Sequence, residues 1–372
     1  MKIKTITCHN VYNIGASLQA YALMEYLQGL GHNVEIIDYV PEYLTHYRLN
    51  EISNSTYDRP ILRELYLLIK LPRRLKEKWG RCKREFDCFS NRYLKVTQRS
   101  YRSFEELQSD PPQADIIFAG SDQIWNTFFR NGKDPAFYLQ FAPKGCIRAA
   151  YAASFATETI ANKWKPQIKR WLGELDFISV REISGVKIVQ ELGINRAVQV
   201  VDPVFLLDRH HWSMVAYDIP MKRPYVLVYD FDNCKDIAEF AKQIARKNRC
   251  TVYSVLKNPF ISHNFASKGP QTFLTLIKNA EVIISNSFHA TAFSLIFEKE
   301  FWVIPRREEI NTRMVDLLRL VGLVDRLIND LQMQKIEDKK IDYGGVNMRL
   351  IRAIIRSQEY INKVLEIGKQ YD

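Results

Sequence analysis

Short apolar runs alternate with segments of helical periodicity along most of this chain. Residues 2–8 have the pattern of a strand, and residues 17–32 carry apolar side chains at helical spacing until Gly29 and Gly31. Residues 33–39 have the pattern of a second strand. This order of strand, helix and strand predicts a parallel βαβ unit, because two parallel strands need a crossover connection.

Further strand-like runs that end in polar or small residues complete a first series. They cover residues 114–126, 147–155, 175–194 and 197–207. The run at 175–194 repeats the plan of strand, polar turn and helix, and Asp202 and Pro203 stop the last strand. These elements predict a Rossmann-like N-terminal domain over residues 1–208.

A second series of the same kind begins near Pro224. Its predicted strands are residues 225–231, 250–255, 281–287 and 300–305, and its predicted helices are residues 234–248, 269–280, 288–299 and 314–322. We predict a Rossmann-like C-terminal domain over residues 222–340 and a C-terminal helix, residues 345–372, that packs back on the rest. The predicted fold class is α/β, with two Rossmann-like domains facing a cleft and ligands at the carboxyl ends of the strands.

The charge of the chain is concentrated in one segment. The 372 residues carry a net charge of +11, and residues 59–102 hold fourteen Lys and Arg against four Asp and Glu. Apolar and aromatic residues are interleaved with these charges, so we predict a basic helical insert at residues 45–110 of the N-terminal domain. Such a helix suits an anionic membrane surface at residues 59–102 or, less well, nucleic acid. The alternative is a solvated helix that only keeps the protein soluble.

Several features bear on where the protein works and on its cofactors. No window approaches the roughly 18–20 apolar residues of a membrane span, and the N-terminus lacks the apolar region of a signal peptide. The six cysteines are scattered without a CxxC pair, which argues against a structural zinc site and favours reduced thiols. We therefore expect a cytoplasmic protein without a metal.

The segment HNVYNIGASLQ, residues 9–19, links the first strand to its helix. Gly15 permits close backbone approach, and the free N–H groups of the following helix attract anions or sugar hydroxyls. Asn13, Gly15 and Gln19 are therefore candidate binding residues, although Asn13 and Gln19 also fit ordinary cap and surface positions. The segment lacks GxGxxG, so a dinucleotide site is not supported.

The segment GSDQIWN, residues 120–126, places a dense set of polar side chains at a strand end. Sugar sites favour amides and carboxylates that bridge adjacent hydroxyls, with an aromatic ring beneath the C–H face of the sugar. The candidates for such a site are Ser121, Asp122, Gln123, Trp125 and Asn126. The alternative is an N-capped helix with Trp125 in the core.

Arg181 in SVRE, residues 179–182, follows a strand that is otherwise apolar. A buried guanidinium needs an anionic partner, because an unpaired charge in the protein interior is very costly. Glu182 is the structural candidate for that partner, and a bound phosphate or carboxylate is the functional one.

His289 in SNSFHA, residues 285–290, stands at the N-terminal end of a predicted helix. The helix dipole favours the neutral form of a nearby imidazole, which is a usable proton acceptor near pH 7. A lone histidine is more often a satisfied structural residue, but the polar run before His289 favours function. Arg313 follows the next strand, and Arg306 and Arg307 lie close by, so this sheet edge suits a small, multiply anionic ligand.

Six segments, in this order, resemble the polysaccharide pyruvyl transferase family: YNIGASLQAYAL, GSDQIWN, YAASF, SVRE, VVDPVFLL and NSFHATAFSLIF. The resemblance covers nearly the whole chain, and GSDQIWN and the histidine segment are its most specific parts. It implies a fold like that of the two-domain GT-B glycosyltransferases. It also implies transfer of a pyruvyl group from phosphoenolpyruvate to two hydroxyls of one sugar, which gives a cyclic ketal and releases phosphate. This chemistry requires no metal, nucleotide or other cofactor.

The resemblance also implies partners and roles for particular residues. The acceptor would be a glycan of a capsule, exopolysaccharide or cell-wall polymer, often linked to a polyprenyl diphosphate, which suits a place at the inner face of the plasma membrane. His289 matches the family's histidine and would be the general acid and base. The implied donor-binding residues, mostly in the C-terminal domain, are Arg181, Arg313, Asn286, Ser287 and Phe288. The implied acceptor-binding residues, in the N-terminal domain, are Asn13, Gly15, Gln19, Ser121, Asp122, Gln123, Trp125 and Asn126.

Ser287 departs from the family pattern, since many members have arginine or a similar residue two positions before the histidine. A serine cannot replace that charge. Either Arg181, Arg313 and backbone N–H groups hold the donor, or a nearby arginine, Arg306 or Arg307, compensates. A third reading is a different donor or a loss of activity. Two other functions stay open: a nucleotide-sugar glycosyltransferase of the same fold, and a non-catalytic protein that binds anionic glycans.

Overall fold

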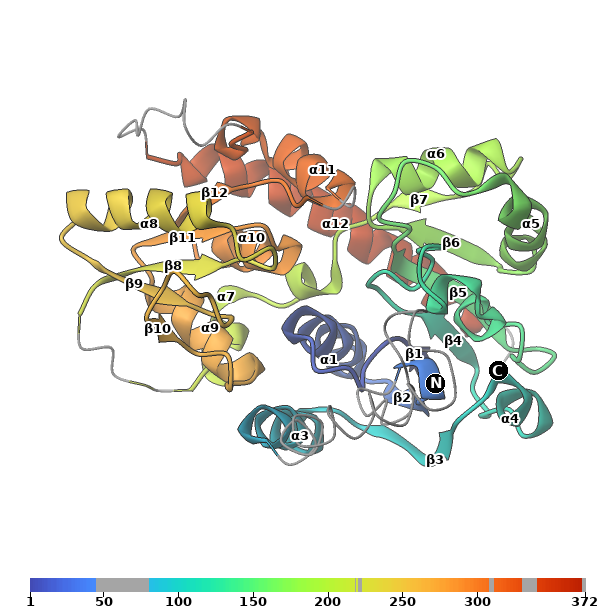
Figure 1. Ribbon diagram of the computed structural model, residues 1–372. Coiled ribbons are helices and arrows are strands. Elements are labelled where there is room, and N and C mark those ends of the chain that lie inside the picture. Colours follow the sequence, from blue (N-terminus) through green and yellow to red (C-terminus); the bar gives the residue numbers. More distant parts are fainter. Residues whose placement is uncertain (45–79, 218, 220–222, 308–310, 330–339, 370–372) are drawn as a thin grey trace, which may run out of the picture.

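The computed structural model describes residues 1–44, 80–217, 219, 223–307, 311–329 and 340–369. These residues form two parallel β-sheets, each accompanied by helices, so the predicted α/β fold class is confirmed. Figure 1 shows the result as two halves, one around each sheet.

The first sheet has the strand order β3-β2-β1-β4-β5-β6-β7, and all of its strand pairs are parallel. Its strands are β1 (Lys2–Ile6), β2 (Asn33–Tyr39), β3 (Val96–Tyr101), β4 (Ile116–Ala119), β5 (Ile147–Ala153), β6 (Phe177–Val180) and β7 (Val198–Gln199). The helices before the second sheet are α1 (Ile14–Gly29), α3 (Arg81–Tyr93), α4 (Phe104–Ser109), α5 (Lys165–Gly173), α6 (Ile183–Glu191) and α7 (Arg209–Val215). Strand β4 is apolar and buried along its whole length, and β5 is so except at Arg148, because parallel sheets are covered on both faces.

The second sheet has the order β10-β9-β8-β11-β12 and is also parallel throughout. Its strands are β8 (Tyr225–Tyr229), β9 (Thr251–Ser254), β10 (His263–Asn264), β11 (Val282–Ser285) and β12 (Glu300–Val303). Its helices are α8 (Lys235–Lys247), α9 (Pro270–Asn279), α10 (Phe288–Ile296) and α11 (Thr312–Val321).

Helix α1 lies between the two sheets (Figure 1). It begins after Asn13, whose Oδ1 accepts a hydrogen bond of 3.2 Å from the backbone N–H of Ala16. The helix is apolar on nearly all sides and is buried from Ile14 to Met24, as expected for a helix surrounded by protein. It packs against β2 of its own sheet, against α9 of the second half and against the short 3₁₀ helix Pro203–Leu206.

The last helix, α12 (Tyr343–Gly368), runs behind both halves (Figure 1). Near its start, the hydroxyl of Tyr343 donates to backbone carbonyl groups of the second half. Further along, Tyr360 donates to the carbonyl oxygen of Ala150 in β5 at 2.7 Å, and Ser357 accepts from the N–H of Val201 at 2.9 Å. One helix therefore fixes the two halves to each other.

The predicted basic helical insert needs correction. Residues 45–79 lie outside the described residues, so this part of the prediction is untested. Residues 96–101 form strand β3 at the edge of the first sheet and not a helix, because they pair in parallel with β2, with Val96 opposite Ile36 and Tyr101 opposite Tyr39. Helix α3 does form, but its aromatic residues Phe86 and Phe89 are buried in the protein core. Within the described chain, no helix has the length and apolar character needed to cross a membrane.

The strand predicted at residues 197–207 is also much shorter than expected. Only Val198 and Gln199 pair with β6, and the chain then turns into the 3₁₀ helix Pro203–Leu206. Proline fits the first position of this helix, and Asp202 caps it by accepting from the N–H of Val204 at 3.1 Å. This turn brings Asp202 to the boundary between the two halves.

Candidate active site between the two sheets

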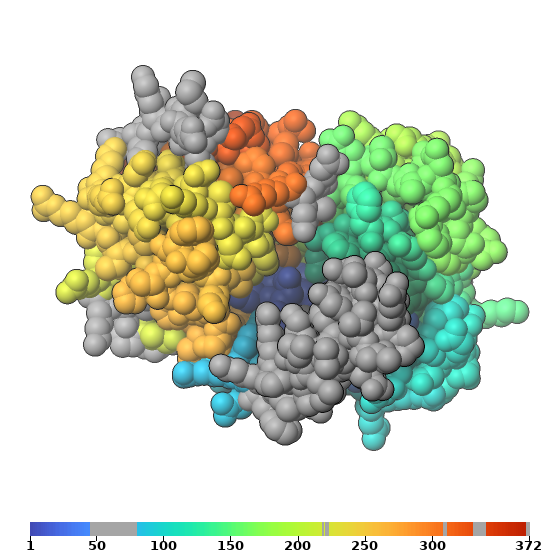
Figure 2. Space-filling model, in the orientation of Figure 1, coloured from blue at the N-terminus to red at the C-terminus, as the bar shows by residue number. Residues whose placement is uncertain are grey.

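The carboxyl ends of both sheets border a cavity of about 110 Å³ between the halves. The first half contributes Asn13, Gly15, Asp122 and Gln123, and the second half contributes Asn286, Ser287, Phe288, His289, Arg306 and Arg313. Figure 2 shows the blue N-terminal segment recessed between the two halves of the surface. The topology thus brings together polar turns that are up to 300 residues apart in the sequence.

His289 lies in the first turn of α10, which Ser287 caps by accepting from the N–H of Ala290 at 3.4 Å. The Nδ1 edge of its imidazole lies against Gly15 at the start of α1. A Cβ atom added at Gly15 would be only 2.0 Å from His289 Nδ1. The close approach that Gly15 permits is made by a histidine of the other half, and Gly15 also borders the cavity.

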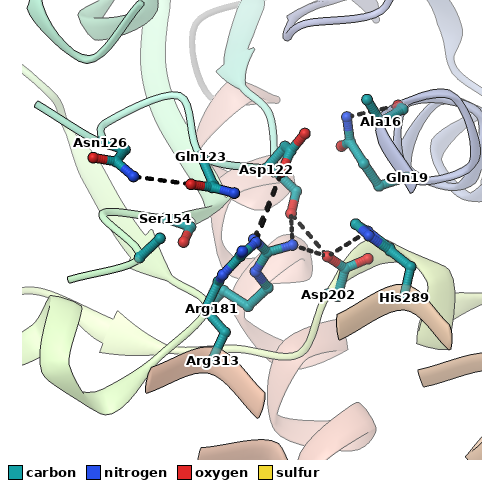
Figure 3. A network of polar contacts seen from close by, with 12 residues as sticks. Ala16, Gln19, Asp122, Gln123, Asn126, Ser154, Arg181, Asp202, His289 and Arg313 are labelled. Atoms are coloured by element: carbon teal, nitrogen blue, oxygen red, sulfur yellow. Dashed lines mark hydrogen bonds and ion pairs between the residues drawn. The ribbon is translucent and has the colours of Figure 1, made fainter. Parts of the chain in front are cut away.

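Asp202 lies on the other side of this imidazole. Its Oδ2 atom is 3.7 Å from His289 Nε2, accepts from Arg181 Nη1, and accepts from the hydroxyl of Ser121 at 3.1 Å (Figure 3). The side chain of Asp202 is completely buried. One carboxylate therefore joins the predicted donor-binding arginine to the predicted acid-base histidine.

The charge state of Asp202 follows from these partners. Burial alone would raise the pKa of this carboxyl, but the charge of Arg181 and, after it, His289 hold the pKa of Asp202 well below its usual range. A permanent carboxylate beside His289 stabilises the imidazolium that forms when the ring accepts a proton, as the aspartate of a catalytic triad does.

Arg181 and Arg313 are stacked on the ring of Phe288. Their guanidinium carbons lie 4.5 and 5.8 Å from the ring centroid, and the two residues are only 5% and 8% exposed. Nε and Nη2 of Arg181 and Nε of Arg313 form no hydrogen bond with any described residue. Burial and the neighbouring charge of Arg181 lower the pKa of Arg313 to about 10, so the guanidinium group of Arg313 remains charged at neutral pH.

Asp122 offers a shared but distant counter-charge to these two arginines. Its Oδ1 lies 3.9 Å from Arg181 Nη2 and 3.9 Å from Arg313 Nη1 (Figure 3). The backbone of Asp122 has a positive φ of 76° and is held there by a 3.0 Å hydrogen bond from the N–H of Ser154 to its carbonyl oxygen. Uncommon backbone conformations of this kind are frequent at functional sites.

Two predicted acceptor-binding residues belong to the core instead. Trp125 is completely buried, is stacked on Tyr138 and donates from Nε1 to the carbonyl oxygen of Phe137 at 3.0 Å. The prediction that its ring lies under a sugar is therefore wrong. Asn126 is buried as well, and its amide donates to Gln123 at 2.9 Å and accepts from the N–H of Phe128.

Three more predicted binding residues have structural hydrogen bonds. Gln19 is fully buried and donates to Thr7 Oγ1 at 2.9 Å, so it neither borders the cavity nor lies on the surface. Ser121 is buried beneath Asp202. Asn286 borders the cavity, but its amide accepts from the N–H of Phe231 and donates to Asp230 at 2.7 Å. These hydrogen bonds hold the turns in place, and Gln19 Oε1 has no hydrogen-bond partner among the described residues.

The predicted partnership of Arg181 with Glu182 is wrong. Glu182 Oε1 accepts three hydrogen bonds of 2.9 Å, from the Ser154 hydroxyl and from the N–H groups of Phe155 and Ala156. Burial raises the pKa of Glu182 despite these bonds and the charge of Arg181. The true partner, Asp202, was visible in the sequence only as a residue that stops a strand. An acidic residue before proline at the end of an apolar run was the signal for it.

The cysteines and the other potential metal ligands among the described residues form no metal-binding cluster. All six cysteines are free thiols, and in the part of the chain that the structure describes no group of three or more His, Cys, Asp or Glu is arranged to hold a metal ion.

The paired Rossmann-like sheets and the polar cavity between them define a GT-B-type α/β protein. The family model for polysaccharide pyruvyl transferase matches residues 13–308, which is most of the chain. The chain therefore belongs to the polysaccharide pyruvyl transferase family, and the resemblance seen in the sequence is confirmed. A comparison with curated proteins gives no match.

Solved structures support the fold. UDP-GlcNAc 2-epimerase from Neisseria meningitidis, bound to UDP-GlcNAc, is similar with a TM-score of 0.51 and 11% identity, over 99% of this chain and 94% of that one. A putative UDP-N-acetylglucosamine 2-epimerase from Listeria monocytogenes has a TM-score of 0.50 and 8% identity, over 97% of this chain and 89% of that one. At these identities the likeness shows the GT-B fold alone.

We expect the substitution Gly15→Ala to destabilise the protein by about 1–3 kcal/mol, because the new methyl group collides with the His289 imidazole. The measurement is the free energy of unfolding from urea denaturation. Gly29→Ala is the matched control, since a Cβ at this position of the same helix meets nothing within 4 Å. The control should be unchanged or more stable by up to about 1 kcal/mol. Equal stability of the two variants would contradict the close approach of His289.

We expect Asp202→Asn to cost about 3–5 kcal/mol at pH 7, because Arg181 then lacks its buried counter-charge. The folded-state pKa of Asp202 is depressed, so its stabilisation is fully present above the unfolded carboxyl pKa of about 3.9 and is lost as the pH falls below that value. Urea denaturation at pH 3, 5 and 7 should therefore show the gap between wild type and variant shrinking at the lowest pH. A gap that stays constant would mean that Asp202 is not the depressed carboxyl.

Proposed function

We propose that this protein transfers a pyruvyl group from phosphoenolpyruvate to a sugar of a surface-polysaccharide precursor, with formation of a cyclic ketal and release of phosphate. The observation that carries the proposal is the cavity that His289 shares with two cations, Arg306 and Arg313, beside the carboxylate of Asp202. This arrangement suits a small ligand with two anionic groups next to a proton-transfer group.

The donor carries a carboxylate and a phosphate, so its site needs more than one cation. Arg313 borders the His289 cavity, and Arg306 lies on the same cavity with its guanidinium 4.9 Å from the ring centroid of Phe231. In this proposal Arg306 supplies the charge that Ser287 lacks, and the N–H groups at the start of α10 contact the phosphate. Arg181 acts from behind Phe288 by holding Asp202 and by adding to the positive field.

His289 performs the proton transfers. In the first step a sugar hydroxyl adds to the central carbon of the enol phosphate, its proton passes to the imidazole, and the imidazolium delivers that proton to the methylene carbon, which becomes the methyl group. In the second step the neighbouring hydroxyl replaces the phosphate at the same carbon, and its proton leaves with the phosphate. Asp202 stabilises the imidazolium in between, and the arginines stabilise the departing phosphate.

The acceptor approaches from the first half. Asn13, Asp122 and Gln123 border the cavity from that side, and they are the polar groups available to sugar hydroxyls. The acceptor is a glycan or a polyprenyl-diphosphate-linked oligosaccharide, and the protein works in the cytoplasm without a cofactor. No feature of the site favours a nucleotide sugar over this donor.

The main test compares wild type with His289→Ala and Arg313→Gln. Phosphoenolpyruvate at about 100 times its dissociation constant should stabilise wild type by about 2.7 kcal/mol, measured by thermal shift. Arg313→Gln should lose this stabilisation. His289→Ala should keep it and lose phosphate release in the presence of galactose-, glucosamine- or mannosamine-terminated lipid acceptors. Arg319→Gln is the control, because this arginine is exposed on the same helix, α11.

Stabilisation by UDP or GDP sugars instead of phosphoenolpyruvate would replace the proposal with a nucleotide-sugar glycosyltransferase. Binding of polyanionic glycans that weakens steeply with salt, without any turnover, would replace it with a binding protein.

We also propose that the basic segment, residues 59–102, contacts anionic membrane. In its described part, Arg81, Arg84 and Arg92 of α3 are exposed while the aromatic residues face inward, so the contact is electrostatic. Vesicles that contain anionic lipid should retain the protein at low salt and release it at high salt. Failure to retain it at low salt would disprove the contact.

A further inference from the structure

A second cavity, larger than the one beside His289, lies behind Phe288. Its volume is about 320 Å³, and we call it the rear cavity. Its walls come from β7, from the start of α6, and from α11 and α12. Phe288 and Arg313 border both cavities, whereas of the two cavities His289 borders only the smaller one and Arg181 only the rear one.

Much of the wall of the rear cavity is apolar. Val198 of β7 and Leu317 and Leu320 of α11 contribute aliphatic side chains. Val198 and Ile183, which also border the cavity, are each 42% exposed, so the cavity reaches solvent beside two apolar side chains. Exposed apolar groups that line a cavity are a common feature of small-molecule binding sites.

The charged groups around the rear cavity are mainly positive. Arg181, Arg313 and Arg356 border it, against Asp202 and Asp316. Asp202 forms an ion pair with Arg181. Asp316 accepts from the N–H of Ile183 at 2.9 Å and lies 3.6 Å from Arg319.

Arg356 is the exposed cation of this group. Its side chain extends from α12 at the border of the rear cavity and forms no ion pair with any described residue. An apolar cavity with an unneutralised guanidinium at its border is complementary to a ligand that is apolar along its length and anionic at one end.

We propose that the rear cavity binds an amphipathic anion, with a hydrocarbon chain against Val198, Leu317 and Leu320 and a phosphate or carboxylate head against Arg356. The cavity volume corresponds to about ten water molecules at ~30 Å³ each, which is enough for a chain of moderate length. Because Phe288 and Arg313 separate it from the His289 cavity, the ligand lies directly behind the groups that we assign to the donor.

Binding is tested by titration calorimetry of the full chain with inorganic phosphate, butyl phosphate and octyl phosphate. Transfer of each methylene from water should increase affinity about fourfold until the cavity is filled, so octyl phosphate should bind at least tenfold more tightly than butyl phosphate. Equal affinities for the three compounds would overturn the proposal, because they would mean that only an anion is recognised.

Two pairs of variants locate the site. Val198→Trp fills the cavity beside the exposed edge of β7 and should weaken octyl phosphate binding at least tenfold, whereas Val198→Thr keeps the side-chain shape and should weaken it much less. Arg356→Gln should weaken binding about tenfold. Arg352→Gln, at an exposed arginine of α12 that does not border the cavity, should leave it unchanged. Unchanged octyl phosphate affinity in Val198→Trp and Arg356→Gln would overturn the proposed location.

The hydrocarbon chain of the ligand could belong to a lipid attached to the acceptor or to a free amphiphile. A second experiment distinguishes these two sources. This kinetic experiment rests on the proposed function. The calorimetry measures binding without turnover, so its result does not depend on the proposed function. If the hydrocarbon chain belongs to the acceptor, Val198→Trp should raise KM at least tenfold for a lipid-linked acceptor and leave KM unchanged for the same sugar without the lipid. If the ligand is free, octyl phosphate should change the rate equally with both acceptors.

Discussion

The buried carboxylate of Asp202 is the centre of the polar network between the two halves. It accepts hydrogen bonds from Arg181 and Ser121 of the first half and lies 3.7 Å from His289 of the second. A carboxylate without solvent is stable only because these partners supply charge and hydrogen bonds, and removing any one of them leaves an uncompensated group in the interior. The positions of Arg181 and His289 are therefore tied to the position of Asp202.

This network also makes the site dependent on how the halves pack. Asp122 of the first half lies 3.9 Å from Arg313 of the second, and Asp316 of the second half accepts from the N–H of Ile183 in the first. The imidazole of His289 fits against α1 only because Gly15 has no side chain. Charge pairing, close packing and the attachment of α12 to both halves thus fix the same relative arrangement, in which His289 lies near Arg181 and Arg313.

Two like charges, Arg181 and Arg313, share the face of one aromatic ring, and each has a nitrogen without a hydrogen-bond partner among the described residues. Asp122 and Asp202 reduce the repulsion but do not satisfy every donor. Under the proposed function, an anion in the smaller cavity would add negative charge beside Arg313. Phe288 and Arg313 border both the smaller cavity and the rear cavity, so ligands in the two cavities would both lie beside Arg313.

Much of the fold and part of the site could be predicted from the sequence. Apolar periodicity located most strands and helices, and the polar turns marked the sheet edges where Asp122, His289 and Arg313 are found, because side-chain patterning and turn chemistry are local properties. Pattern alone failed where a side chain's environment depends on distant residues. A tryptophan in a polar turn fits a sugar platform or a core position equally well, and only the packing of Tyr138 on Trp125 decides for the core.

By itself, then, the sequence determined the α/β class, the family and the positions of the polar turns, since each of these depends on order and spacing along one chain. The tertiary structure decided which turns meet. In the structure the partner of Arg181 is Asp202 and not Glu182, and His289 lies against Gly15. Several side chains that were predicted to bind ligands form hydrogen bonds within the turns instead. The physical reason is that burial and charge pairing are properties of three-dimensional neighbours, and residues 15, 122, 202 and 289 become neighbours only when two sheets and the helix between them are packed.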